Sequence, residues 1–418
     1  MKNKLRSIFS SFLSAVLLVA LLTVGMSSAA AEEETADASV KGSLVIIGGG
    51  LETGNAEIYN KMIELAGGKQ DAVIGIFPTA SASMSSSRSM KQDFEDYGVP
   101  AENVRIIEIT EKNYKDQVNN DEIVEAISEC TALYFVGGDQ SRVTKAFYNE
   151  DGSNSKALDA VWDVYRKGGL VAGSSAGAAI MSDPMILNAT SLEALQKGVT
   201  YDEQKPGLWV TKGLGFFEAG ITDQHFSKRG RLGRLVVALV HEKINYGFGI
   251  DENSAMVVSG DEIEVIGASG MFLVDASKAD FTKKGAYLGI DVSYLEKGDR
   301  YNFATKEFTV HSSKTLIRPG QEYYEGNELN TNIFGSDAAK TALLDDLMDN
   351  TAKEARGLTF ALDQKNGKGS GFSVVFSKTA QTKGYYDSDE YASTALHVNM
   401  DIIPIEVQVK ELEHMPKK

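Results

Sequence analysis

The sequence is poor in cysteine and histidine, and its basic residues are outnumbered by its acidic ones. A single cysteine, Cys130, stands among 418 residues, which excludes an intrachain disulfide and every metal cluster built from several cysteines. Five histidines are too few to favour a histidine-rich metal site. The 42 lysines and arginines against 58 aspartates and glutamates leave a net charge of −16, so no domain-wide basic field is present to bind nucleic acid. We therefore expect no metal, no cofactor and no nucleic-acid partner, and a chemistry that uses hydroxyls, carboxylates, amides and one histidine.

Long apolar runs are also scarce, and the one that stands out lies near the N-terminus. Basic residues at positions 2, 4 and 6 precede an apolar run from Phe12 to Val24, and small residues follow as far as Ala31. This order is typical of a secretory signal peptide, whereas an apolar core of roughly 13 residues is short for a membrane span. We expect a signal peptide over 1–31 that is cleaved after Ala31, a polar leader over 32–42, and a secreted protein without stable membrane insertion. A retained membrane anchor is the alternative.

Beyond the leader, short apolar runs alternate with amphipathic stretches. Strands are expected over 43–47, 73–77, 104–109, 133–136 and 169–173, and helices over 55–66, 88–97, 121–128, 143–147 and 156–167. Apolar runs buried on both faces and separated by helices are typical of a mostly parallel sheet in a layered α/β fold. Ligands bind beyond the carboxyl ends of such strands. The glycine-rich segments 48–50, 137–140 and 173–177 therefore mark the expected functional edge, although 48–50 lacks the spacing of a nucleotide-binding loop.

The texture of the chain changes after about residue 247. Short strands over 255–259, 262–266 and 270–274 indicate antiparallel hairpins that close the sheet. We expect one domain over 43–304. Polar loops, one helix over 338–356, and strands near 358–362, 371–377 and 397–409 indicate an accessory α+β region over 305–418.

A candidate nucleophile lies in the sequence Gly-Ser-Ser-Ala-Gly, which begins at Gly173 and is centred on Ser175. Small residues on either side of Ser175 permit the sharp strand-to-helix turn that exposes a nucleophilic serine above a sheet. The N-terminus of the following helix offers backbone N–H groups to an oxyanion. The alternative is a small-residue turn that serves only tight packing.

A serine nucleophile needs a base, and His225 is the best-placed histidine because it follows a predicted strand. Asp251 and Glu252 follow another short strand and could orient the imidazole. Asp223 is nearer in sequence but shares a strand face with His225 and would not orient it. The order serine, histidine, acid differs from that of the α/β-hydrolases, which makes that fold a poorer expectation.

Four motifs together carry a family resemblance. They are Gly137-Gly-Asp-Gln140, Gly173-Ser-Ser-Ala-Gly-Ala178, Asp223-Gln-His-Phe226 with the arginines after it, and Gly249-Ile-Asp-Glu252. In order and spacing they resemble the cyanophycinase family, serine peptidases with a class I glutamine amidotransferase-like fold. The resemblance runs from about residue 41 to about residue 303. It implies that Ser175 is the nucleophile, His225 the general base and Glu252 the third member of the triad, with Gly138 and Ala176 as oxyanion donors.

The resemblance also implies a substrate, since cyanophycin is a polyaspartate chain with arginine on each side-chain carboxyl. A secreted serine exopeptidase that releases β-Asp-Arg dipeptides from a chain end is the leading interpretation. Substrate contacts are expected from Gln140, Asp223, Gln224, Arg229, Arg231 and Arg234. The arginines would bind substrate carboxylates, unless they form a solvated basic face. Asp223, Asp251 and Glu203 are the acidic candidates for the substrate guanidinium.

Two alternatives remain beside the cyanophycin-cleaving exopeptidase. One is an aspartyl dipeptidase of the same superfamily, and the other is a non-catalytic polymer-binding protein on a hydrolase scaffold. The expected partner in each case is a peptide or polymer, and a homodimer stays an option.

Overall fold

The computed structural model describes residues 42–202, 204–390 and 392–410. The predicted signal peptide and all but the last residue of the leader lie outside the described residues. Within the described ranges, no helix is long and apolar enough to cross a membrane. In the same ranges, no group of three or more histidine, cysteine, aspartate or glutamate residues is placed to hold a metal ion.

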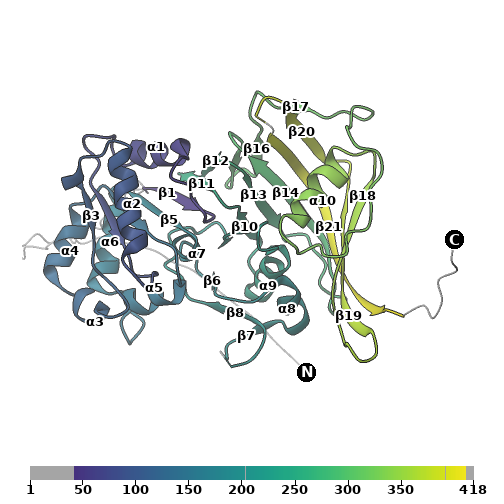
Figure 1. Cartoon of the computed structure of the whole chain (residues 1–418), viewed down its shortest axis with the longest axis horizontal. Helices are drawn as coiled ribbons and strands as arrows, with labels where there is room; N and C mark the ends of the chain where they lie inside the picture. The colour runs from purple at the N-terminus through teal and green to yellow at the C-terminus, as the bar shows by residue number, and fades with distance from the viewer. Residues whose placement is uncertain (1–41, 203, 391, 411–418) are drawn as a thin grey trace, which may run out of the picture. The chain divides into compact units, whose positions relative to one another are not determined.

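The first sheet contains the parallel strands that the sequence predicts. Its order is β16 (Glu307–Thr309), β15 (Arg300–Asn302), β12 (Glu262–Gly267), β11 (Ser254–Ser259), β1 (Ser43–Ile47), β5 (Leu170–Ser174), β4 (Ala132–Phe135), β2 (Ile74–Phe77) and β3 (Val104–Ile106). The run from β1 to β3 is parallel throughout, and β11, β12, β15 and β16 extend it in antiparallel fashion (Figure 1). The predicted layered, mostly parallel sheet is therefore confirmed.

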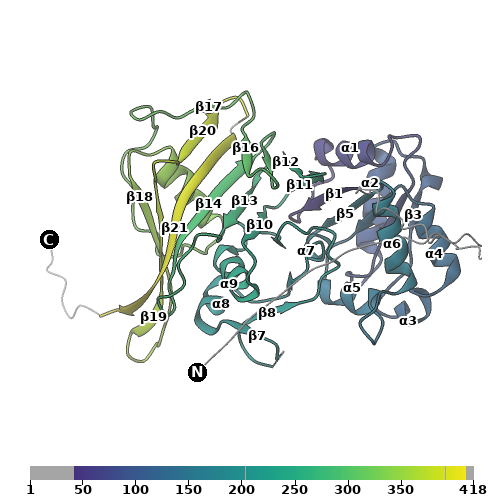
Figure 2. The same ribbon diagram turned by 180° about the vertical axis from the view of Figure 1, so that it is seen from behind.

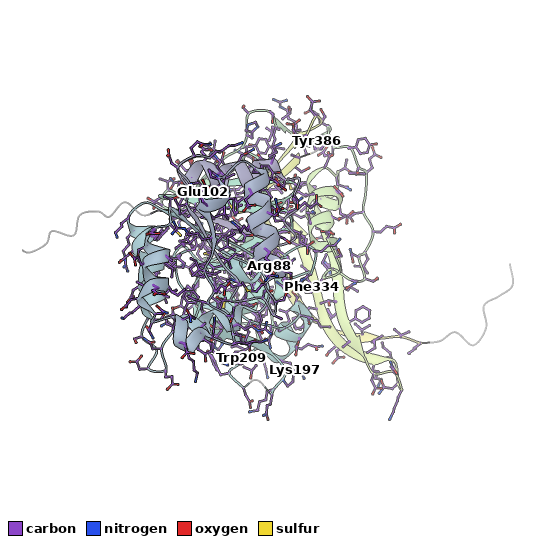
Figure 3. The ribbon with its side chains drawn as sticks, turned by 60° about the vertical axis from the view of Figure 1, so that its left-hand side comes forward. Arg88, Glu102, Lys197, Trp209, Phe334 and Tyr386 are labelled. Atoms are coloured by element: carbon purple, nitrogen blue, oxygen red, sulfur yellow. The ribbon has the colours of Figure 1, made fainter. Side chains whose placement is uncertain are left out.

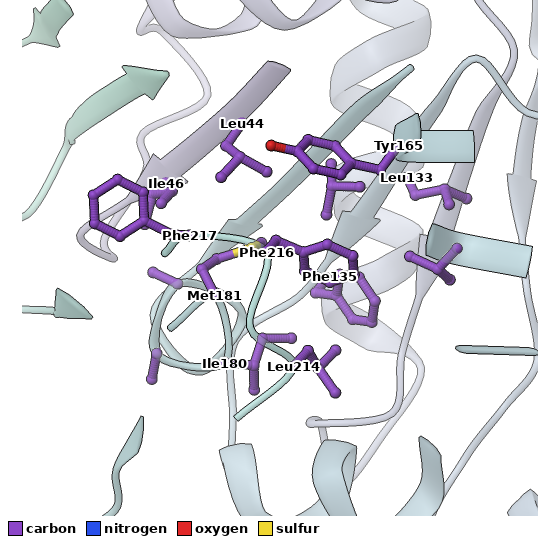
Figure 4. Close-up of a cluster of buried hydrophobic side chains, with 14 of the residues drawn as sticks. Leu44, Ile46, Leu133, Phe135, Tyr165, Ile180, Met181, Leu214, Phe216 and Phe217 are labelled. Carbon is purple, nitrogen blue, oxygen red and sulfur yellow. The ribbon is translucent and has the colours of Figure 1, made fainter. Parts of the chain in front are cut away.

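Helices cover both faces of this sheet because alternate residues of its strands point to opposite sides. Val45 and Ile47 pack with α1 (Ala56–Leu65) and α2 (Ser85–Asp96). Leu44 and Ile46 belong to the core on the other face, part of which is drawn in Figure 4. The helices on that second face are α4 (Asp121–Ser128), α5 (Gln140–Phe147), α6 (Lys156–Arg166) and α7 (Ala176–Ala179). Two short elements, η1 (Ala101–Asn103) and α3 (Tyr114–Gln117), complete this part of the chain.

Cys130 lies in this second-face core. Its thiol is buried and donates to the carbonyl of Ala126 at 3.2 Å, and burial raises its pKa to about 12. It is a packed residue of this core.

The second sheet draws strands from both sides of residue 304. Its order is β17 (Thr315–Leu316), β20 (Lys383–Asp387), β21 (Ala392–Gln408), β14 (Tyr287–Glu296), β13 (Gly270–Asp275), β10 (Tyr246–Ile250) and β9 (Ile221–Asp223), while β18 (Glu354–Leu362) joins β21 through β19 (Lys368–Ser377). Its core includes α8 (Ser191–Lys197), α9 (Leu232–Glu242), α10 (Ala338–Leu343) and η2 (Leu344–Met348). A small sheet of β6 (Met185–Ile186), β8 (Leu208–Thr211) and β7 (Val199–Thr200) is also present. Figure 2 shows these strands from behind. The domain boundary expected at residue 304 stays a prediction.

Two sequence-based expectations were wrong. The helix expected over 338–356 ends at Met348, and its last residues belong to β18. The buried Asn350 makes the break, since its side-chain amide donates to the carbonyls of Gly326 and Asp345 and its oxygen accepts from the Ala352 N–H.

The second wrong expectation is that the strand over 270–274 closes the first sheet. As β13 it pairs with β10 and β14 in the second sheet. An apolar run predicts a strand but not its partner. Here Phe272 and Val274 complete the core of the second sheet.

Candidate active site

The three glycine-rich segments meet at the carboxyl edge of the first sheet. The Ser175 N–H donates to the carbonyl of Ile47, the last residue of β1, at 3.1 Å. A Cβ on Gly137, which follows β4, would lie 3.2 Å from the Cβ of Ser175. The loops after β1, β4 and β5 thus enclose the Ser175 side chain.

Ser175 stands at a strained turn between β5 and α7. Its backbone angles are φ 56° and ψ −111°, a conformation that costs a non-glycine residue free energy. The turn is tight because no side chain fits at its ends. A Cβ on Gly173 would come 2.4 Å from the carbonyl oxygen of Gly177, and one on Gly177 would come 2.1 Å from the carbonyl oxygen of Phe135. The geometry is that of a nucleophile elbow.

Serine, imidazole and carboxylate are hydrogen-bonded in series at this turn. His225 Nε2 lies 2.8 Å from Ser175 Oγ, and His225 Nδ1 lies 2.5 Å from Glu252 Oε1. The His225 side chain is 9% exposed and that of Glu252 is 35% exposed, whereas Ser175 is half-buried, so the imidazole is the most buried member of the series.

The members of the series come from different sheets. Ser175 follows β5 of the first sheet, whereas His225 follows β9 and Glu252 follows β10, which are parallel neighbours in the second sheet. His225 reaches the serine from another sheet, which the sequence did not predict. Its own φ is 48°, and its N–H donates to the carbonyl of Gly48 at 2.6 Å.

The surroundings of the imidazole disfavour its protonation. Burial lowers the pKa of His225 below its ordinary value, the bond to Glu252 opposes this, and the charges of Arg229 and Arg231 lower it further. A neutral imidazole with its Nε2 on a serine hydroxyl can accept the hydroxyl proton.

The glycine-rich loop after β1 packs its backbone against the side chains of His225 and Glu252, a role that the sequence did not reveal. Gly49 has φ +107°, and a Cβ on it would lie 2.3 Å from His225 Cε1. A Cβ on Gly50 would lie 3.4 Å from Glu252 Oε2. The signal that could have found this is the run Gly48-Gly-Gly50 itself, since a ring packed on a backbone requires residues without side chains.

Two of the residues expected to bind substrate bind each other instead. Arg234 donates through Nε to Asp223 Oδ2 at 2.7 Å and through Nη2 to Oδ1 at 2.5 Å. The Arg234 side chain is 3% exposed and that of Asp223 is 1% exposed. Burial alone would raise the pKa of Asp223, but the charges of Arg234 and Arg231 hold it below its ordinary value. Because this pair is complete inside the protein, the structure does not favour Asp223 or Arg234 as substrate ligands.

Asp251 is also occupied by protein groups. Its Oδ1 accepts from the Ser227 N–H at 2.8 Å, and its Oδ2 accepts from the Tyr294 hydroxyl at 2.7 Å. The third acidic candidate, Glu203, lies outside the described residues.

The remaining candidates for substrate binding differ in how far protein groups already bind them. Arg229 is exposed, and in the described part of the chain no carboxylate lies within salt-bridge distance of its guanidinium. Arg231 is 11% exposed at its side chain and donates to the Gln224 carbonyl at 2.5 Å. The side-chain oxygen of Gln224 is buried and has no protein donor among the described residues. Gln140 is buried, and its amide donates to the carbonyls of Ile186 and Leu187, each at 3.1 Å.

The two expected oxyanion donors lie at the same edge. Ala176 is the first residue of α7, and Gly138 lies between β4 and α5. Within the described ranges, neither backbone N–H donates to a carbonyl or a side chain. A free N–H at the start of a helix is suited to a developing negative charge.

Comparison with known proteins gives the family of the chain. Residues 44–266 match the model of peptidase family S51. A cyanophycinase from Geminocystis herdmanii is 29% identical over 281 residues, which span 64% of this chain and 96% of the relative. A cyanophycinase from Nostoc sp. is 30% identical over 257 residues, 60% of this chain and 80% of the relative. A solved peptidase from an acI-B1 actinobacterium is 22% identical, with a TM-score of 0.47, and the match covers 63% of this chain and 98% of that one.

The chain is therefore a serine-type peptidase. It belongs to peptidase family S51, and its resemblance to the cyanophycinases is confirmed.

Proposed function

We propose that this peptidase hydrolyses cyanophycin and releases β-Asp-Arg dipeptides from a chain end. The observation that carries the proposal is the series Ser175–His225–Glu252, with contacts of 2.8 Å and 2.5 Å at the edge of the parallel sheet. The substrate is supported by the cyanophycinases among its relatives, which match this chain over 60–64% of its length.

In the proposed reaction, Ser175 Oγ attacks the scissile carbonyl carbon while its proton passes to His225 Nε2. The oxyanion accepts hydrogen bonds from the Ala176 and Gly138 N–H groups, and Glu252 stabilises the imidazolium that has formed. The imidazolium then protonates the leaving amine, the C–N bond breaks, and an acyl-serine remains. Water, deprotonated by the same histidine, hydrolyses the ester and regenerates the serine.

Substrate recognition in this proposal uses the candidates that remain beside the Asp223–Arg234 pair. Arg229 is exposed and has no carboxylate partner among the described residues, so its guanidinium can bind a substrate carboxylate in a bidentate manner. Arg231 contributes a second positive charge from a largely buried position. Among the described residues the side-chain oxygen of Gln224 has no hydrogen-bond donor, and in this proposal it accepts from the substrate guanidinium. Gln140 holds the end of β6 in place through its bonds to the carbonyls of Ile186 and Leu187.

The test is incubation of the purified protein with cyanophycin, followed by identification of the products by mass. We expect β-Asp-Arg dipeptides from the wild type. Ser175→Ala should lower kcat by on the order of 10³-fold or more, as for other serine triads. His225→Ala should do the same, and the double variant should be little worse because the two residues act as one unit. Ser175→Ala activity within tenfold of the wild type would falsify the assignment.

The same experiment separates the alternatives. Cleavage of free β-Asp-Arg but not of the polymer would identify an aspartyl dipeptidase. Binding of the polymer without any cleavage by the wild type would identify a polymer-binding protein.

We further propose that the protein is exported after cleavage behind Ala31, on the basis of the N-terminal order of basic, apolar and small residues. Sequencing the N-terminus of the protein recovered from the culture medium tests this. A chain found only in the cell with its first residues intact would contradict it. The homodimer stays a prediction.

A further inference from the structure

A segment of the accessory region lies directly against the loop that follows His225. The Asp337 N–H donates to the Ser227 carbonyl at 2.9 Å. Gly230 has φ +55°, and a Cβ on it would lie 2.0 Å from the carbonyl oxygen of Phe334, whose side chain is labelled in Figure 3. The two backbones are therefore in contact, and only glycine fits at the contact point.

Lys340, on α10 of this segment, reaches a buried carboxylate. Its Nζ lies 3.8 Å from Asp251 Oδ2 and donates to Ser269 Oγ at 3.2 Å. The same Asp251 oxygen accepts from Ser269 Oγ at 3.2 Å and from the Tyr294 hydroxyl at 2.7 Å. The Asp251 side chain is 3% exposed, whereas that of Lys340 is 24% exposed. A buried charge is stable only with such partners, and Lys340 supplies the positive one.

Asp251 joins the two segments that carry the base and the acid of the triad. It precedes Glu252 directly, and its Oδ1 accepts from the Ser227 N–H, two residues after His225, at 2.8 Å. Both segments are held in unfavourable backbone conformations, with φ 48° at His225 and φ 55° at Asn253. Such conformations persist only where the surroundings hold them. The Asp251 carboxylate is one of the bonds that do so.

We propose that Lys340 is a positioning residue for the triad. Through Asp251 it holds the loop of His225 against the segment of Glu252, so that the accessory region is part of the catalytic apparatus. Lys340 lies outside residues 44–266, which the family model matches, so this support is supplied by the additional region of the chain. The inference rests on the proposed serine chemistry.

The test uses the full chain with Lys340→Met, Lys340→Arg and a matched control, Lys228→Met. Lys228 is an exposed lysine that contacts the same segment, at 3.6 Å from Asp337 Oδ2, but it does not contact Asp251. The readouts are kcat and KM on cyanophycin and the rate at which a small fluorophosphonate labels Ser175. Thermal unfolding shows that each variant is folded.

Displacement of a catalytic group by about 1 Å costs on the order of 10²-fold in rate. We expect Lys340→Met to lower kcat and the labelling rate together by roughly 10- to 100-fold, with KM within about threefold of the wild type. Lys340→Arg should restore most of the loss, and Lys228→Met should change nothing. A folded Lys340→Met protein with wild-type kcat and labelling would overturn the proposal, as would an arginine variant as defective as the methionine one.

A second variant covers the case in which Lys340→Met does not fold. Tyr294→Phe removes only the hydroxyl bonded to Asp251 Oδ2 and should also lower kcat and labelling with KM unchanged. Wild-type kcat in Tyr294→Phe would then overturn the role of the Asp251 network. Failure of the proposed chemistry is seen separately, because in that case the wild type itself would not be labelled at Ser175.

Discussion

Removing the carboxylate of Asp223 should destabilise the fold far more than it weakens substrate binding. The Asp223–Arg234 pair is almost fully buried and bidentate, with bonds of 2.7 Å and 2.5 Å, and Arg231 lies at 3.4 Å from the same carboxylate. Asp223→Asn leaves the Arg234 guanidinium buried without a counter-charge.

The size of the effect follows from this geometry. Breaking a buried ion pair on one side costs about 3–5 kcal/mol, and two charged hydrogen bonds of about 1.5–3 kcal/mol each lead to a similar figure. Against a total stability of about 5–15 kcal/mol for a typical protein, the variant should fold but unfold at a markedly lower urea concentration. The pKa of Asp223 is lowered in the folded state, so its contribution is present above the unfolded value of about 3.9 and is lost as the pH falls through the folded value.

The assay is equilibrium unfolding in urea, followed by the fluorescence of the two tryptophans, for Asp223→Asn, Arg234→Met and the double variant. The double variant should lose less than the sum of the single losses, because it buries no stranded charge. The reasoning is refuted if Asp223→Asn lies within about 1 kcal/mol of the wild type while its KM rises. That outcome would return Asp223 to the substrate.

Three further outcomes follow from the electrostatics of the structure. Glu252→Gln should lower kcat on the order of 10²- to 10⁴-fold with little change in KM. Because Glu252 raises the pKa of His225, the variant should also shift the acid limb of the pH–rate profile to lower pH, and an unchanged limb would speak against the pairing. Arg229→Gln should shift that limb to higher pH, since the Arg229 charge lowers the pKa of His225. It should also raise KM roughly 10-fold for substrates with a free carboxylate, and an equal loss of affinity for a neutral ester would make Arg229 structural. The bond to Asp291 raises the pKa of His397, and burial opposes it only in part, so the stabilisation from this pair is present below about pH 6.5 and is lost as the pH rises through the folded value. His397→Gln should abolish that dependence in urea unfolding measured from about pH 5 to about pH 9.

Much of the secondary structure could be predicted because its cause is local. The strand over Ser43–Ile47 and the helix over Asp121–Ser128 have the predicted bounds. A short apolar run that is followed by a helical pattern has few alternatives to a buried strand of a parallel sheet. The end of the helix expected over 338–356 could not be predicted, because it depends on a bond from Asn350 to Gly326, a residue outside that helix.

The candidate site divides in the same way. The turn at Ser175 is visible in the sequence because it requires small residues on both sides, and the four motifs already indicate serine, histidine and glutamate together. Composition likewise excludes an intrachain disulfide and clusters of several cysteines without reference to the fold.

The tertiary structure decided which charged groups pair with each other in the interior and which stay exposed. Arg229, Arg231 and Arg234 are equivalent by pattern, yet Arg234 is bound to Asp223 in the interior and Arg229 is exposed without a carboxylate partner among the described residues. It also brought His225 and Glu252 to Ser175 from a second sheet, and Lys340 to Asp251 from the accessory region. Periodicity and turn chemistry act over a few residues and can be read along the chain. The partner of a buried charge is chosen by the packing of segments up to about a hundred residues apart, so only the folded chain reveals it.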